Sequence, residues 1–324
     1  MNNNLLSYID NSFLAPLLMD SGVTDISYNG VSLFYQHNVF GRKKARLFVT
    51  SDEINDFIRQ IANMSEKQFS FTSPFLDISI DRYRINAVHS SITRVNNDKA
   101  LSFSMRIASK ELRINNDKEF MDDKAKTILE TALKENKSIV IAGPTGSGKT
   151  ELQKYLLSSL KENTRIIIID NIQELEFVRV NKELDITSWQ VNTNNSIGTF
   201  EELIRNALRS NPDWLVIAES RGKEMNDVLN SVMSGHPIIS TLHAQNVMMM
   251  PHRMARMVEM SDSTQKYDDI MSDILEHIPY YIYLNKYFDE NNKVHRYIET
   301  IAKTDLTHKK LEIIYRKETR NEKR

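Results

Sequence analysis

The sequence contains no cysteine among its 324 residues. This absence excludes a disulfide scaffold, a thiol nucleophile, a zinc ribbon and an iron–sulfur site. An excess of charge is also missing, because 42 Lys and Arg against 43 Asp and Glu leave a formal net charge of −1. A chain this neutral has no overall field that would attract nucleic acid or an acidic membrane, so either contact would need a local patch.

Long apolar runs are missing as well. No stretch approaches the ~20 apolar residues that cross a bilayer, and Met1 to Asn4 lack the positive start of a signal peptide. We therefore expect a cytoplasmic protein, with peripheral attachment to the inner face of the cell membrane left open. Apolar residues make up 40% and charged residues 26%, as in ordinary globular proteins, and the length suggests about two domains.

The first part of the chain reads as short strands with one or two helices. Residues 23–28 and 32–36 predict strands joined at Asn29-Gly30, a dipeptide that favours a tight turn. Thr50 and Glu53 form a capping-box pattern before a helix. Further strands are expected over residues 76–80, 84–88 and 101–107. The pattern predicts an α+β domain over residues 1–107 and a polar linker or hinge over residues 108–124.

From residue 125 to the end, strands alternate with helices. Strands are expected over residues 138–142, 165–170, 213–218 and 237–242, and helices over residues 150–160, 199–210 and 223–233. Continuous apolar strands between helices predict an α/β fold with a mostly parallel sheet covered on both faces. After residue 250 we expect mainly helix, with one strand over residues 280–284 and a solvated tail over residues 309–324.

A phosphate-binding loop is the most specific motif. It matches G-x-x-x-x-G-K-[ST] and lies between an expected strand and an expected helix. Glycines let successive N–H groups turn toward an anion, and the helix that follows presents its positive end to the same anion. The lysine supplies a mobile cation, and the hydroxyl that follows can bind Mg²⁺. The loop consists of Gly143, Pro144, Thr145, Gly146, Ser147, Gly148, Lys149 and Thr150.

The loop alone does not choose between ATP and GTP. The guanine-reading pattern Asn-Lys-x-Asp is absent, since its nearest match, residues 285–288, ends in Phe288. We therefore expect ATP as the nucleotide, with Mg²⁺ as its metal.

Acidic residues follow two of the expected strands. Glu219 follows residues 214–218, and Asp170 follows residues 165–169 with Glu174 shortly after. Carboxyl ends of parallel strands line the ligand crevice, so these acids are expected near the phosphates. Glu219, with Thr150, is the candidate for holding Mg²⁺, and Glu174 is the candidate base for the attacking water. His243 ends another expected strand, where it is either a sensor of the nucleotide or a satisfied core histidine.

These motifs, in this order, resemble the secretion ATPase superfamily, which includes the motors of type II and type IV secretion, conjugation and type IV pili. The resemblance rests on the loop Gly143 to Thr150, an Asp-box-like segment 170–175, a Walker B-like segment 208–222 and a His-box-like segment 234–244. Arg253 and three segments of the first domain, 24–29, 82–86 and 104–106, also fit the family pattern.

The resemblance implies a RecA-like ATPase domain preceded by a smaller PAS-like domain, assembled as a homo-hexameric ring. It implies that Glu174 is the catalytic glutamate, Glu219 the Walker B glutamate and His243 the sensor. It further implies that Arg84 and Arg106 of the first domain reach the phosphates. Arg209 and Arg221 are weaker candidates, level with ordinary surface arginines.

Two positions depart from the family pattern. Asn171 stands where the Asp box usually has an acid, and Ala218 stands where the Walker B segment usually has glycine. Lys149, Glu174 and Glu219 remain, so we expect activity. The lack of cysteine also means that the tetracysteine metal subdomain of many type II secretion and pilus-extension ATPases is missing, which favours the type IV secretion and conjugation branch or the pilus-retraction branch.

The sequence leaves several functions open. The first is a cytoplasmic ATPase motor that acts on inner-membrane proteins of a type IV secretion or conjugation channel, with no direct contact to nucleic acid. A pilus motor would use the same chemistry on a different partner. A RecA-like motor that moves nucleic acid is disfavoured, because the chain is near neutral and has no basic stripe interleaved with aromatics. An assembly factor that binds nucleotide without hydrolysis is the fourth reading.

Overall fold

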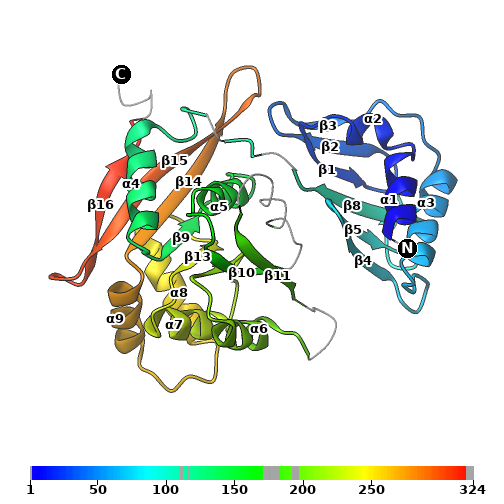
Figure 1. Cartoon of the computed structure of the whole chain (residues 1–324). Helices are drawn as coiled ribbons and strands as arrows, with labels where there is room; N and C mark the ends of the chain where they lie inside the picture. The colour runs from blue at the N-terminus through cyan, green and yellow to red at the C-terminus, as the bar shows by residue number, and fades with distance from the viewer. Residues whose placement is uncertain are drawn as a thin grey trace. The chain divides into compact units, whose positions relative to one another are not determined.

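A computed structural model describes residues 2–109, 112–114, 117–170, 175, 183–191 and 197–318. It divides into two compact units (Figure 1). Unit 1 comprises Met1–Lys110 and Phe288–Val294, and unit 2 comprises Glu111–Tyr287 and His295–Arg324. Across the described ranges, the helices are all too short or too polar to pass through a bilayer.

Unit 1 is built on an antiparallel sheet of six strands in the order β3-β2-β1-β8-β5-β4. A small hairpin of β6 and β7 stands apart from it. The helices are α1 (Asn2–Asp10), α2 (Ala15–Leu18) and α3 (Ser51–Met64). The strands are β1 (Val23–Tyr28), β2 (Leu33–His37), β3 (Gly41–Lys44), β4 (Phe75–Ile80), β5 (Tyr83–Val88), β6 (Arg94–Val95), β7 (Asp98–Lys99) and β8 (Ser102–Ile107).

Local signals in unit 1 act as predicted. Gly30 takes a φ of +95° between β1 and β2, a conformation that a residue with a Cβ rarely adopts. Thr50 and Glu53 form the complete capping box at the start of α3. The apolar side of α3, with Phe57 and Ile61, packs into the core formed with the sheet.

Unit 2 contains an eight-stranded sheet in the order β11-β10-β12-β13-β9-β14-β15-β16. Its helices are α4 (Asp123–Lys134), α5 (Lys149–Ser158), α6 (Phe200–Ala207), α7 (Met225–Met233), α8 (Met250–Val258) and α9 (Tyr267–His277), with the 3₁₀ turns η2 (Leu208–Ser210) and η3 (Val247–Met249). Its strands are β9 (Ile139–Ala142), β10 (Arg165–Asp170), β11 (Asp185–Gln190), β12 (Trp214–Ile217), β13 (Ile238–Leu242), β14 (Tyr280–Phe288), β15 (Val294–Asp305) and β16 (Lys310–Arg316). Phe288, at the end of β14, groups with unit 1.

Helices cover both faces of this sheet, as the continuous apolar strands predicted. Neighbouring strands from β11 through β14 pair in parallel. Ile139 and Ile141 of β9 pack on the side of α4 and α5, while Val140 and Ala142 pack on the side of α6 to α9 (Figure 1). Because the strand is buried on both sides, it shows no polar alternation. The α/β fold and mostly parallel sheet are therefore confirmed.

The expectation of a mainly helical end after residue 250 is wrong beyond α9. Residues 280–316 form β14, β15 and β16, and β15 pairs antiparallel with β16. Residues 310–316 do not form a solvated tail, because Leu311 and Tyr315 are buried and the Tyr315 hydroxyl donates to Asp122 Oδ2 at 2.7 Å. The charged residues of β16 are exposed, namely Lys310, Glu312 and Arg316. The charge-rich composition therefore hid a strand that has buried residues.

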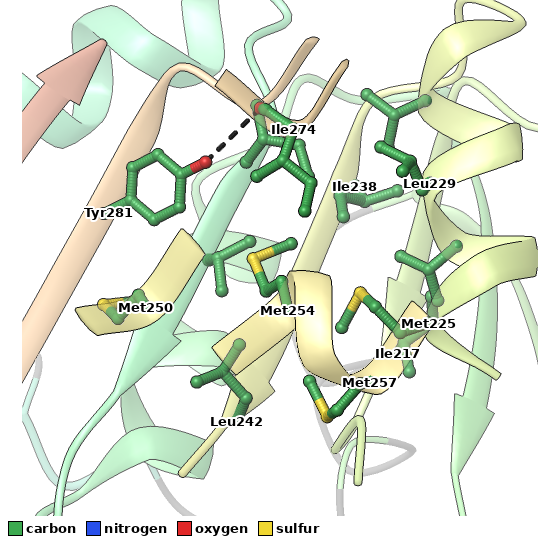
Figure 2. Packing of buried hydrophobic residues seen from close by; sticks show 14 of the residues in the cluster. Ile217, Met225, Leu229, Ile238, Leu242, Met250, Met254, Met257, Ile274 and Tyr281 are labelled. Atoms are coloured by element: carbon green, nitrogen blue, oxygen red, sulfur yellow. Dashed lines mark hydrogen bonds between the residues drawn. The ribbon is translucent and has the colours of Figure 1, made fainter. Parts of the chain in front are cut away.

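A methionine-rich stretch supplies part of the core on the α6–α9 side. Met250, Met254 and Met257 are fully buried among residues from β12, β13, α7 and α9 (Figure 2). Met248 and Met260 from the same stretch are exposed. The unbranched thioether side chain fits irregular spaces, which suits it to this helix–sheet seam.

Part of the expected linker belongs to the core of unit 2. Ile114, Phe120 and Met121 are buried on the α4–α5 side of the sheet. Asp122 then caps α4 by accepting from the backbone N–H of Ala125 at 2.9 Å. These contacts position Phe120 next to the phosphate-binding loop.

Candidate active site

The phosphate-binding loop connects β9 to α5, in the strand-to-helix context that the motif requires. Gly146 and Gly148 have φ values of +73° and +97°, and Gly148 is the N-cap of α5. A Cβ at Gly148 would lie 2.9 Å from a ring carbon of Phe120. Both the backbone conformation and the close packing therefore demand glycine here. Lys149 and Thr150 are the first two residues of α5.

The Lys149 side chain folds back over the loop. Its Nζ donates to the carbonyl of Gly143 at 2.8 Å and to that of Pro144 at 3.3 Å. The ammonium group thus lies inside the loop that its own backbone forms. An anion bound there would meet this cation together with the N-terminal end of α5.

The ends of three parallel strands bring the other candidate residues together. β12 leads through Ala218 to Glu219, and β13 leads to His243. The two connections are held by the Thr241 hydroxyl, which donates to the Ala218 carbonyl at 2.6 Å, and by Ser220 N–H, which donates to the Thr241 carbonyl at 2.8 Å. Asp170 ends β10, the neighbour of β12, and is buried.

Glu219 lies between two cationic side chains and a histidine. Its Oε2 is 2.8 Å from an NH2 group of Arg221, and its Oε1 is 3.2 Å from Nε2 of His243. Burial opposes ionisation, but the Arg221 hydrogen bond and the charges of Arg221, His243 and Lys149 outweigh it and lower the pKa of Glu219. Glu219 is therefore a carboxylate at neutral pH, directed at the same region as Lys149.

His243 is neutral at pH 7. Burial and the charge of Lys149 lower the pKa of His243 below its usual value of 6.5, although Glu219 acts in the opposite direction. A neutral ring can donate from Nε2 to Glu219, and the Gly143 backbone also interacts with the ring. Of the two readings that the sequence left open for His243, the satisfied core histidine does not fit, because its side chain is 51% exposed.

The described site is therefore a continuous network from Lys149 through Gly143 and His243 to Glu219 and Arg221. Glu174, the predicted catalytic glutamate, and Asn171 lie outside the described residues. The network has the parts that a P-loop enzyme uses on a triphosphate: an anion-binding loop, a mobile cation, a hydroxyl and a carboxylate.

Comparison with known proteins identifies the family. Residues 84–278 match the family described as Type II/IV secretion system protein. The chain belongs to this family. Its members are secretion-system ATPases, which are enzymes that hydrolyse ATP.

Two relatives show how far the sequence likeness extends. A protein of Bacillus anthracis is 31% identical over 260 residues, which are 77% of this chain and 56% of the relative. The type IV secretion system protein VirB11 of Bartonella quintana is 36% identical over 137 residues, which are 42% of this chain and 38% of VirB11. The chain thus spans about half or less of the length of these relatives.

Solved structures share the fold of this family member. The ATPase DotB of Legionella pneumophila has a TM-score of 0.66 at 19% identity, over 91% of this chain and 81% of DotB. The pilus retraction motor PilT, solved with bound ADP, has a TM-score of 0.63 at 16% identity, over 91% of this chain and 83% of PilT.

The predicted arginines of unit 1 lie side by side on its sheet. Arg84 of β5 is directly opposite Arg106 of β8 in the antiparallel register. Arg84 also contacts Asp77 through two hydrogen bonds, of 3.2 and 2.9 Å. Opposite side chains in such a register share one face of the sheet, and Asp25 of β1 is also directly opposite Arg106, so this face carries two arginines together with two carboxylates.

The two weaker arginine candidates differ in their surroundings. Arg221 is part of the network through Glu219, and Arg253 donates to the Arg221 carbonyl at 3.2 Å. Arg209 is exposed in η2. Arg221 therefore contacts the network directly through Glu219.

Sequence reasoning missed residues that shape the site. Glu224, just before α7, accepts from the backbone N–H groups of Arg221 and Gly222 at 2.5 and 2.8 Å and so supports the loop after Glu219. Lys286 and Arg296 contact the carbonyls of the phosphate-binding loop. Arg221 is not a capping residue type, and the N-cap of α7 is Glu224 itself, so the capping-box pattern does not point to this contact. No local pattern points to Lys286 or Arg296.

Proposed function

We propose that this chain is the ATP-driven motor of a type IV secretion or conjugative transfer machine. The observation that carries the proposal is the network that joins Lys149 of the phosphate-binding loop to Glu219 and His243 at the ends of neighbouring strands. Membership of the secretion-system family and the likeness to VirB11 of Bartonella quintana support the machine assignment.

The nucleotide is assigned to the loop Gly143 to Thr150. Lys149 turns from its own loop carbonyls to the β- and γ-phosphates, because a phosphate is a stronger partner for an ammonium than a neutral carbonyl. The hydroxyl of Thr150 and the carboxylate of Glu219 are hard oxygen donors that would hold Mg²⁺, and the metal would neutralise charge on the phosphates. Among the described residues, no cluster of three or more His, Cys, Asp or Glu could hold a metal by itself. This fits a metal that arrives with the nucleotide.

Cleavage requires residues on both sides of the γ-phosphate. We assign proton removal from the attacking water to Glu174, in line with the family pattern, and orientation at the phosphate to His243. Arg84 and Arg106 supply positive charge from unit 1, where guanidinium groups suit bidentate phosphate contacts. The hinge across which the two units close on ATP and open after hydrolysis lies within the segment 108–124, ahead of the residues of that segment that are buried in unit 2.

The working form is a cytoplasmic homo-hexameric ring at the inner face of the cell membrane, acting on inner-membrane proteins of the machine and not on nucleic acid. A pilus motor is the second candidate, since PilT shares the fold, but a fold alone does not choose between the two machines. Two other functions would give different results in the tests that follow: a motor that moves nucleic acid, and a factor that binds nucleotide without hydrolysis.

The first test measures phosphate release by the purified chain and its Lys149→Ala variant. We expect the variant to lose turnover about 10²-fold or more, because it lacks the cation at the transferred phosphate. The exposed Lys310→Ala variant is the matched control and keeps wild-type turnover. Hydrolysis that survives Lys149→Ala, or a wild type that binds ATP without releasing phosphate, contradicts the proposal. Stimulation by single-stranded DNA favours a nucleic-acid motor instead.

The second test separates the two machines in the natural host. A deletion strain receives the wild-type gene or the Lys149→Ala variant and is scored for conjugative transfer and for pilus retraction. Our proposal requires that wild type, and not the variant, restores transfer. Restoration of pilus retraction alone would move the assignment to the pilus motor.

Mass photometry with and without ATP measures the number of subunits in the ring, for which we expect six.

A further inference from the structure

Four successive carbonyls of the phosphate-binding loop are each held by a cationic side chain. Lys149 binds those of Gly143 and Pro144 from within the loop. Lys286 Nζ donates to the carbonyl of Thr145 at 2.7 Å, and Arg296 Nε donates to the carbonyl of Gly146 at 2.7 Å. Two of the three cations therefore come from β14 and β15, which no motif of the site includes.

Lys286 and Arg296 are anchored in the sheet. Both side chains are intermediate in exposure. The backbone N–H of Lys286 donates to the side-chain oxygen of Asn285 at 2.8 Å, and Asn285 in turn donates to Glu299 of β15 at 2.5 Å. Arg296 also interacts with Glu151 of α5, the helix that follows the loop. The cations are thus attached to two consecutive strands on one side of β9, which gives them fixed positions.

A contact that fixes a carbonyl group also fixes the direction of the N–H group in the same peptide unit. All described peptide bonds of the chain are trans, so the C=O of one residue and the N–H of the next point in opposite directions. When Lys286 holds the Thr145 carbonyl, the N–H of Gly146 points away from β14. When Arg296 holds the Gly146 carbonyl, the N–H of Ser147 points away from Arg296, and it reaches across the loop toward the Pro144 carbonyl at 3.2 Å. The Pro144 carbonyl is also a partner of Lys149, which marks the inner side of the loop.

Positive charge is concentrated around this part of the loop. Burial and the nearby Arg296 lower the pKa of Lys286, and burial and Arg113 lower the pKa of Arg296. The charge of Arg296 thus disfavours that of Lys286, and the charge of Arg113 disfavours that of Arg296. The Glu151 carboxylate acts in the opposite direction on Arg296. An anion bound in the loop relieves this repulsion, so the energy of the cluster favours phosphate.

We propose that Lys286 and Arg296 are positioning residues of the nucleotide site, which hold the Thr145 and Gly146 carbonyls toward β14 and β15 so that the following N–H groups stay turned toward the bound phosphates. The proposal rests on the nucleotide-binding role assigned to the loop above. It assigns to β14 and β15 a part in shaping the phosphate site. Neither side chain needs to touch the nucleotide.

The test compares Lys286→Met and Arg296→Met with the wild type in the full chain. Methionine keeps an unbranched chain of similar length and removes the donor. We measure the Kd for MgADP by calorimetry, and the KM and kcat for ATP by phosphate release. Each variant is expected to raise Kd and KM about tenfold, which equals ~1.4 kcal/mol and is typical for a hydrogen bond that involves a charged group. We expect kcat to stay within about twofold, since the contact is made in the ground state and the transition state alike.

Conservative variants and a control make the result specific. Lys286→Arg and Arg296→Lys keep a cationic donor and are expected to restore MgADP affinity to within about threefold of wild type. Lys310→Met removes an exposed lysine at the start of β16 and is expected to leave Kd and KM unchanged. Circular dichroism checks the fold of each variant. Where a methionine variant is unfolded, the leucine variant of the same residue, which also lacks a donor, replaces it, with the same expected weakening.

Three outcomes would overturn the inference. The first is an unchanged Kd for MgADP in folded variants that lack the cation. The second is a fall in kcat with unchanged KM, which would make the residue a transition-state contact. The third is a conservative variant as weak as the methionine variant, which would indicate a packing role. A wild type that does not bind MgADP would instead refute the proposed function itself, so the two failures are distinguishable.

Discussion

His243 Nε2 lies 3.2 Å from Oε1 of Glu219, a contact that joins the ends of β13 and β12 beside the phosphate-binding loop. Both side chains have a lowered pKa, so near neutral pH the pair is a neutral imidazole and a carboxylate. A neutral donor can orient the carboxylate without cancelling its negative charge. Mg²⁺ or its water ligands would need that charge. This contact and the Arg221–Glu219 pair set the electrostatics of the site.

Removal of the Glu219 charge is expected to separate binding from turnover. In Glu219→Gln the shape of the side chain is kept, but the carboxylate that faces Lys149 is lost. We expect kcat to fall about 10²-fold or more, while ADP in the absence of Mg²⁺ binds within about threefold of wild type, since its phosphates are held by the loop. Glu276→Gln, an exposed change in α9, serves as control. Wild-type turnover in Glu219→Gln would exclude Glu219 from the chemistry.

Acid conditions are expected to destabilise unit 2 in part through His243. Because the folded pKa of His243 lies below its usual value, the unfolded chain binds a proton more readily than the folded chain. The stability that the neutral form of His243 contributes is therefore fully present above about pH 6.5 and is lost as the pH falls through the folded pKa.

The measurement is urea unfolding of wild type and His243→Gln between pH 5 and pH 7.5. Both tryptophans, Trp189 and Trp214, belong to unit 2, so their fluorescence reports on that unit. We expect the wild-type curve to fall more steeply below pH 6.5 than the variant curve. Parallel curves would show that the surroundings of His243, namely Lys149, Glu219 and Arg221, do not disfavour its charged form.

A charge contribution from unit 1 is tested at Arg106. If the arginines of the sheet of unit 1 stabilise the γ-phosphate, Arg106→Gln lowers kcat about 10²-fold, as loss of a charge-stabilising donor does. The stability of the chain should change little, because Arg106 is exposed. Arg42→Gln is a matched control in β3, where Arg42 donates to Ser27 at 2.8 Å. Equal kcat values for the two variants would remove Arg106 from the proposal.

The Mg²⁺ assignment is tested by titration of the metal. In Thr150→Ala the hydroxyl is absent. We therefore expect the Mg²⁺ concentration for half-maximal turnover to rise about tenfold, which is the lower end of the loss in metal affinity when a group around a metal is removed. Thr150→Ser keeps the hydroxyl and should titrate like the wild type. Chelation with EDTA should stop turnover in all three proteins. An unshifted titration in Thr150→Ala would assign the metal to other ligands.

Local chemistry explains which features could be predicted from the sequence. Thr50 with Glu53 and Thr199 with Glu202 form the capping boxes that their spacing indicates, because the partners lie within one helical turn. The apolar strands of the parallel sheet were recognisable, since burial on both faces leaves no polar alternation. β15 and β16 were missed, because charged residues at exposed positions mask the buried side of a sheet edge.

By itself the sequence determined the phosphate-binding loop, the acids and histidine after neighbouring strands, and the family. Each of these depends on residues close together in the chain or on a fixed order of motifs. Only the tertiary structure decided that Arg221 and His243 share Glu219, and that Lys286 and Arg296 hold the loop more than 130 positions before them. Except for Arg221, which is close to Glu219 in the chain, these partners are distant in sequence. Their contacts form because the sheet places β12 beside β13, and β9, β14 and β15 side by side, a consequence of packing that no local pattern encodes.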